Sequence, residues 1–144
     1  MTVENALKKA RKYGAKTIYD VVDDYQFFVH PLDLGSDLCG IFTKTGSCIQ
    51  IGINSRLSQG KQEFVLAHEI GHALMHRHIK LLHCTKFSIF SLDQIEFEAN
   101  KFAVLFLWDQ NDYCNIAHFC RAHELEIDLV KDLFGGRMGK GSIL

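Results

Sequence analysis

Two histidines and a glutamate in the run His68-Glu69-Ile70-Gly71-His72 have the types and the spacing for metal-assisted hydrolysis. Residues four apart on an α-helix lie on nearly the same side, about 6 Å apart along the axis, so both imidazoles can bind one ion. Imidazole is a usual zinc ligand, and zinc makes a coordinated water acidic. Glu69 lies one step round the helix, where it can accept that water's proton. The motif predicts a zinc site with Glu69 as the catalytic base.

A catalytic zinc needs a third protein ligand, and His78 is the first candidate. It follows His68 by ten residues, as the last histidine does in long-motif metalloproteases. Those motifs place a glycine where this chain has Met75, which is a good helix former. An unbroken helix would carry His78 about 15 Å beyond His68, so the spacing disfavours it.

Glu96 is the second candidate, and the helix predicted over residues 92–108 carries it. Its helix face is small and weakly polar, which suits close packing over a metal, and is shared with Ala99, Asn100 and Ala103. We predict Glu96 as the third ligand. Asn100 can accept a hydrogen bond from the far nitrogen of a ligand histidine. Glu98 points to another side, with Lys101, and is predicted to be a solvated ion-pair residue.

Helices and short strands that would position these residues follow one another along the chain. Apolar spacing and capping residues predict helices over residues 2–12, 17–25, 58–78, 92–108, 112–121 and 124–134. Strands are predicted at 27–29, 38–44 and 48–53, the last two joined by a turn at 45–47, with a loop at 79–91. This order predicts an α+β fold in which a small antiparallel sheet packs on the motif helix and the Glu96 helix. We expect a single domain over residues 1–144.

Composition excludes several other classes of protein. Hydrophobic residues make up 47% and charged residues 23%, which is typical of a folded domain. The formal net charge of −1 leaves no basic surplus for nucleic acid. The first residues lack an apolar export segment, and the longest apolar run, 102–108, is too short to span a bilayer, so we expect a soluble cytoplasmic protein. The five cysteines form no C-x-x-C pair, which favours reduced thiols.

Four further residues could stabilise the oxyanion of a hydrolytic transition state, and the sequence does not choose among them: His76, His83, Tyr113 and His118. For His76 and His83, ordinary helix-end or surface positions are the simpler interpretation. The glycine-rich stretch 135–142 does not match a phosphate-binding loop.

The chain resembles the ImmA/IrrE family of metallopeptidases. The resemblance rests on F-x-L-A-H-E-I-G-H-A-L-x-H at 64–76, E-x-E-A-N-x-F-A at 96–103 and the strand at 49–54, and covers roughly residues 38–108. It implies a zincin-like, gluzincin-type fold in which His68 and His72 bind zinc, Glu96 completes the site and Glu69 catalyses. It also implies cleavage of a helix-turn-helix repressor of a phage or integrative element.

These observations predict an intracellular zinc endopeptidase that acts on a protein substrate. The alternative is a regulatory module that keeps the metal site and binds a repressor or an antitoxin-like partner without cutting it. Family members often continue past the second helix with L-L-M-P, and this chain has Leu105-Phe106-Leu107-Trp108 in that region. Manganese or iron could also occupy such a ligand set.

Overall fold

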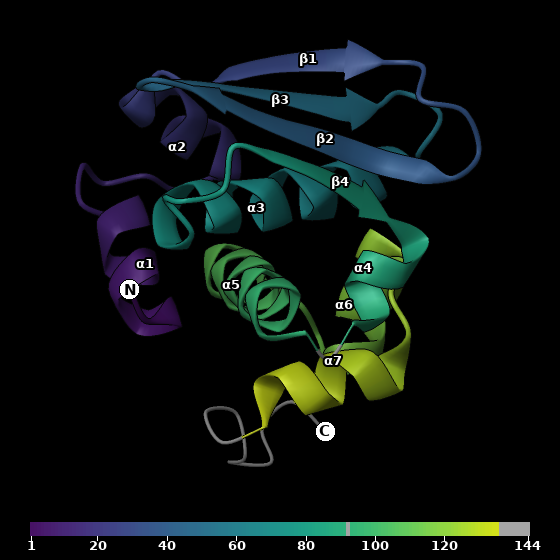
Figure 1. The fold of residues 1–144 in the computed structure, drawn as a ribbon. Coiled ribbons are helices and arrows are strands. Elements are labelled where there is room, and N and C mark those ends of the chain that lie inside the picture. Colours follow the sequence, from purple (N-terminus) through teal and green to yellow (C-terminus); the bar gives the residue numbers. More distant parts are fainter. Residues whose placement is uncertain (92, 136–144) are drawn as a thin grey trace.

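Residues 1–91 and 93–135 are described by a computed structural model, and the glycine-rich stretch 135–142 lies outside the described residues from position 136 on. The described residues form a mixed α+β fold, as expected, with one sheet and seven helices. The helices are α1 (Val3–Ala10), α2 (Ile18–Tyr25), α3 (Gln59–Met75), α4 (Lys86–Phe90), α5 (Gln94–Gln110), α6 (Ile116–His123) and α7 (Ile127–Phe134). The strands are β1 (Phe28–Leu32), β2 (Leu38–Thr45), β3 (Cys48–Asn54) and β4 (Leu81–Thr85). The sheet covers one side of α3, and α5 lies on the other side (Figure 1).

The four strands are arranged in the order β1-β3-β2-β4. The hairpin of β2 and β3 forms as predicted: Thr45 pairs with Cys48, and Gly46 takes the positive φ of 62° that such a tight turn requires. β4 pairs antiparallel with β2. β1 runs parallel to β3, however, so the prediction of a purely antiparallel sheet is wrong for this edge strand.

Two further sequence predictions are wrong. β1 continues through Pro31, where the prediction ended the strand, because an edge strand has one side without partners and tolerates a proline. The predicted loop at 79–91 contains β4 and α4. β4 forms against the free edge of β2, and such a long-range pairing leaves no local pattern in the sequence.

Helix α3 is the central element of the fold. Ser58 caps its start by accepting a hydrogen bond from the backbone N–H of Lys61. Every residue from Phe64 to His72 is buried, so the helix is surrounded by other elements. It ends at Met75, three residues before the predicted end. The polar side chains of the motif are therefore held inside the protein and need partners there.

Gly71 lets α5 approach α3 closely. A Cβ atom at this position would lie 3.1 Å from Cδ1 of Phe102 and 3.3 Å from Cα of Ala99. Ala99 lies one turn after Glu96 on the same face of α5. The missing side chain of Gly71 thus sets the distance at which Glu96 meets the motif histidines.

We expect Gly71→Val to lower the free energy of unfolding by about 1–3 kcal/mol and to weaken metal binding, because the added side chain must push α5 away. Denaturant unfolding and metal titration measure the two effects. Ala73→Val is the matched control, since Ala73 lies on the same helix but is only half buried and lines a surface hollow of about 290 Å³. Helix propensity alone would favour Gly71→Val and disfavour Ala73→Val, so a loss in the Gly71 variant no larger than in the Ala73 variant would contradict the role of the crossing.

Candidate metal and catalytic site

The two motif histidines turn their Nε2 atoms toward each other in the core. The atoms lie 3.2 Å apart, and the side chains of His68 and His72 are almost completely buried. Potential ligand atoms of His68, Glu69 and His72 all lie within 4.8 Å of one another. Burial lowers the pKa of His72 to about 4, so its imidazole is neutral at pH 7, as a metal ligand must be.

Glu96 meets both imidazoles from α5. Its Oε1 lies 2.6 Å from Nε2 of His72 and 3.5 Å from Nε2 of His68. Burial opposes ionisation of Glu96, but its contacts with the two imidazoles outweigh burial and lower its pKa, so it is a carboxylate at neutral pH. The competing candidate, His78, is exposed beyond the end of α3. Of the two candidates for the third ligand, Glu96 lies beside the motif histidines and His78 does not.

Asn100 fixes the orientation of His68. Its side-chain amide nitrogen donates to the carbonyls of Ser88 and Ile89, so its oxygen must face the imidazole. That oxygen lies 2.7 Å from Nδ1 of His68, which therefore carries the proton. In the neutral ring, Nε2 then presents a lone pair to the space shared with His72 and Glu96.

A second hydrogen-bonded chain fixes His72. Nδ1 of His72 lies 2.9 Å from Nδ1 of His76, and Nε2 of His76 lies 2.9 Å from Oε1 of Glu98. A carboxylate only accepts, so Nε2 of His76 donates to Glu98, and Nδ1 of His76 can accept from His72. Nε2 of His72 is then unprotonated and carries a free lone pair, like Nε2 of His68.

The series of hydrogen bonds from His72 through His76 to Glu98 was not predicted from the sequence. Glu98 was predicted to be a solvated residue, and that is wrong, because its contact is with His76. His76 was assigned an ordinary helix-end position, although His72 and His76 lie four residues apart on one helix face. That spacing was the available signal.

Replacing His76 by leucine should weaken zinc binding by about 10–100-fold, because the Nδ1–H of His72 loses its acceptor and the ring is no longer held. Competition with a chromophoric chelator measures the affinity. His78→Leu is the control, since His78 is exposed and two residues away. Unchanged affinity in the His76 variant would exclude this role.

The three converging atoms fit a tetrahedral divalent cation. Ligands at the usual 2.0–2.1 Å from a tetrahedral zinc lie about 3.4 Å from one another. Two of the separations, 3.2 and 3.5 Å, match this value, and the third, 2.6 Å between His72 and Glu96, is shorter. Two lone pairs and a carboxylate repel one another at such distances unless a positive charge lies between them. The chemistry of the donor set is therefore that of a metal site.

Glu69 is a fully buried carboxylate next to His68. Its side chain has no exposed surface, and within the described part of the chain neither oxygen accepts a hydrogen bond. Oε1 lies 3.7 Å from Nε2 of His68. Burial raises the pKa of Glu69 to about 7. A group so placed can exchange a proton near neutral pH with a molecule held at the metal position.

The raised pKa of Glu69 has a consequence for the stability of the metal-free protein. The unfolded chain releases this proton near pH 4.5 and the folded chain near 7, so stability falls as pH rises between those values. Glu69→Gln removes this loss. We expect the metal-free variant to gain stability over the wild type from pH 4 to pH 8, by on the order of 3 kcal/mol. Urea unfolding in the presence of a chelator measures it, and a difference that does not depend on pH would contradict the assignment.

The remaining oxyanion candidates lie in other surroundings. The hydroxyl of Tyr113 is 2.7 Å from Nε2 of His123, and Nδ1 of His118 accepts from the backbone of Cys114. His83 is exposed on β4. Within the described structure none of the three forms a hydrogen bond or an ion pair with the motif residues, and the oxyanion role stays unassigned.

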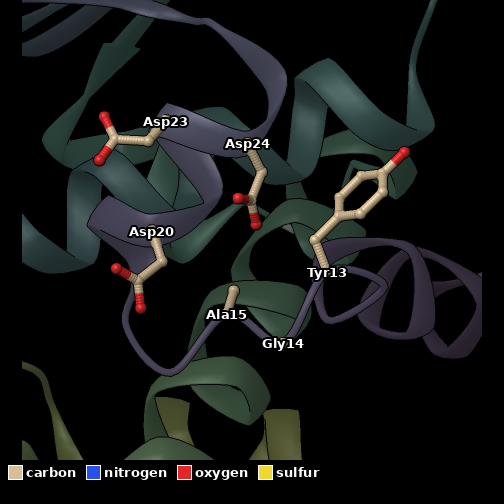
Figure 2. Close-up of a pocket in the computed structure, with 6 residues that line it drawn as sticks. All are labelled: Tyr13, Gly14, Ala15, Asp20, Asp23 and Asp24. Carbon is tan, nitrogen blue, oxygen red and sulfur yellow. The ribbon is translucent and has the colours of Figure 1, made fainter.

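A separate acidic hollow of about 190 Å³ lies where the chain passes from α1 to α2 (Figure 2). Figure 2 shows Tyr13 and the carboxylates of Asp20, Asp23 and Asp24 around it. Asp20 has a structural role: its carboxylate accepts from the backbone N–H groups of Lys16 and Thr17 and completes the capping box of α2. This hollow is not part of the metal site.

Comparisons with known proteins relate this chain to a peptidase family and to two named relatives. The model of a peptidase family, Peptidase M78, described as the IrrE N-terminal-like domain, matches residues 42–118. An "Uncharacterized immunity region protein 2" of Bacillus phage phi105 is 32% identical over 108 residues, which are 73% of this chain and 68% of the relative. Metallopeptidase ImmA of Bacillus subtilis (strain 168) is 27% identical over 96 residues, which are 65% of this chain and 54% of ImmA.

No helix in the described part of the chain is long and apolar enough to cross a membrane. The matched residues 42–118 include both helices of the site, with the motif histidines, Glu69 and Glu96. With a family model covering more than half of its length, this chain belongs to the ImmA/IrrE family of metallopeptidases.

Proposed function

We propose that this protein is a zinc-dependent endopeptidase of zincin-like fold, in which His68, His72 and Glu96 bind the metal and Glu69 is the catalytic base. One observation carries the proposal. Two imidazole nitrogens, each left unprotonated by the hydrogen bond behind its ring, converge with a carboxylate beside a buried glutamate that has no hydrogen bond from the described residues. Metal-assisted hydrolysis uses all four groups.

The residues would divide the work of peptide hydrolysis. Zinc, when bound, supplies Lewis acidity that polarises the scissile carbonyl and acidifies the attacking water. Glu69 would take a proton from that water and later deliver it to the leaving amine nitrogen. Burial suits Glu69 to both steps, since a pKa of about 7 lets it accept and release a proton near neutral pH. Asn100 and His76 would hold the imidazoles in place.

The proposed substrate is a helix-turn-helix repressor of a phage or integrative element. The protein would act in the cytoplasm, with residues 1–144 forming a single domain. The names of two relatives support this choice: one is an immunity region protein of a phage, and the other is called Metallopeptidase ImmA. A phage immunity region is where a repressor of this kind would act. Zinc is the proposed ion, although manganese or iron suit the same ligands.

Incubation with the repressor encoded beside this protein's own gene tests the proposal. Metal analysis should find about one zinc per chain. We expect discrete repressor fragments on a gel, none after treatment with a chelator, and their return when zinc is added back. Parallel addition of manganese and iron identifies the ion that supports cleavage.

Two outcomes would contradict parts of the proposal. Fragments that persist in the chelator would exclude a metal-dependent reaction. Stable association with an intact repressor, without fragments at any metal, would favour the alternative of a non-catalytic regulatory module. Mass spectrometry of the fragments would locate the cleaved bond.

A further inference from the structure

Cys39 and Cys84 form a buried pair of thiols on neighbouring strands. Leu38 pairs with Thr85 and Gly40 with Cys84, so Cys39 is the extra residue of a bulge in β2. A bulge breaks the alternation of side chains, and here both cysteines are buried on the covered side of the sheet. The thiol of Cys84 lies 3.9 Å from the backbone carbonyl of Thr85, to which it donates. The register of the two strands makes Cys39 and Cys84 cross-strand neighbours.

The bulge also forms part of the wall beside Glu69. A Cβ atom added to Gly40, the neighbour of Cys39, would lie 3.0 Å from Cγ1 of Val65 and 3.8 Å from Cγ of Glu69. The backbone of the bulge therefore packs directly on the segment of α3 that carries the base. A displacement of Cys39 would be transmitted to Glu69 through Gly40.

The surroundings of Cys39 favour its thiolate. The neighbouring thiol of Cys84, supported by the positive charges of Lys61 and Lys86, outweighs burial and lowers the pKa of Cys39 to about 7. Thiolates react with peroxides where thiols do not, and a second thiol on the neighbouring strand can resolve the product. Neither the proposed hydrolysis nor the metal site uses these two side chains.

We propose that Cys39 and Cys84 are a redox modification site, a dithiol that a peroxide converts to a disulfide, and that closure of the disulfide lowers activity by displacing the wall of Glu69. The Cys39 sulfur attacks one peroxide oxygen, which forms an S–O bond and breaks the O–O bond, and the first water leaves. The Cys84 sulfur then displaces the oxygen as a second water and forms the S–S bond. Hydrogen peroxide is reduced to two waters, and the two thiols lose two electrons and two protons.

A disulfide holds its sulfur atoms about 2 Å apart, closer than two unbonded thiols can lie, and we expect the bulge to shift when the bond closes. Only the effect on activity rests on the proposed peptidase function; the disulfide itself does not. The two parts can therefore be tested separately.

Tryptic mapping of the folded full-length chain tests the disulfide. Cys39 lies on the peptide 17–44 and Cys84 on 81–86, whereas Cys48 lies on 45–56 and the last two cysteines share 102–121. After treatment with hydrogen peroxide and alkylation of the remaining thiols, we expect a linked 17–44/81–86 peptide that a dithiol reductant separates. Absence of this peptide, or its appearance only after denaturation, would overturn the proposal.

Cleavage assays on the same samples test the effect on activity. We expect at least a tenfold loss in the oxidised wild type, recovery on reduction, and no such reversible loss in Cys84→Ser. Cys114→Ser is the control: its cysteine is exposed, and the variant should respond like the wild type. A linked peptide with undiminished activity would overturn the regulatory step. If the reduced protein cuts nothing, the proposed peptidase function is contradicted. The presence or absence of the linked peptide would still show whether Cys39 and Cys84 form a disulfide.

Discussion

Glu69→Gln should abolish peptide cleavage while leaving zinc bound. Glutamine has nearly the same shape as glutamate but cannot accept a proton, so the variant loses general acid–base catalysis, which contributes about 10²–10⁴-fold. Metal binding should persist because Glu69 is not one of the three predicted ligands. The structure itself should persist as well, because neither carboxylate oxygen of Glu69 has a hydrogen-bond partner among the described residues. Initial rates of repressor cleavage and metal analysis of the same preparation measure the two quantities.

Glu63→Gln is the matched control for this experiment. Glu63 lies on the same helix and undergoes the same change, but its nearest ionic contact is His123, 3.9 Å away. The Glu63→Gln variant should cleave the repressor at close to the wild-type rate. Cleavage by the Glu69 variant at more than about a tenth of the wild-type rate would mean that another group moves the proton.

The parts of the site that follow from local geometry could be predicted from the sequence. The spacing of His68 and His72 determines their relation on any helix, and the helices predicted to start at 58 and 17 begin at Gln59 and Ile18 in the structure. The small face of α5 around Glu96 correctly indicated close packing, because Gly71 and Ala99 meet there.

The parts that were missed depend on contacts between distant segments. β4 exists because β2 offers it a free edge, and no pattern within residues 79–91 reveals that. The interpretation of Glu98 failed for a related reason. A helical face shows which residues lie together, but not which neighbour they meet, and here the neighbour is His76 at the end of α3. The position of Cys39 beside Cys84 on the neighbouring strand likewise needs both the bulge and β4.

Glu96→Ala should reduce zinc affinity by more than the 10–100-fold loss expected when a residue behind a ligand is removed. The change takes away one of three protein ligands, together with the negative charge that balances the cation. It should leave the helix intact, since alanine is the best helix former. Competition with a chromophoric chelator gives the affinity, and far-ultraviolet circular dichroism checks the fold.

Glu98→Ala, on the same helix, distinguishes a glutamate that binds the metal from one that only supports a ligand histidine through His76. Glu98 contacts His76 and not the converging nitrogen atoms of the metal site. Its loss should therefore reduce zinc affinity by about 10–100-fold, as expected for the loss of His76. The predicted order of zinc affinity is therefore wild type, then Glu98→Ala, then Glu96→Ala. If Glu96 were an ordinary surface acid, its removal would change little and this order would be reversed. The order itself, and not the size of either loss, decides whether α5 supplies the third ligand.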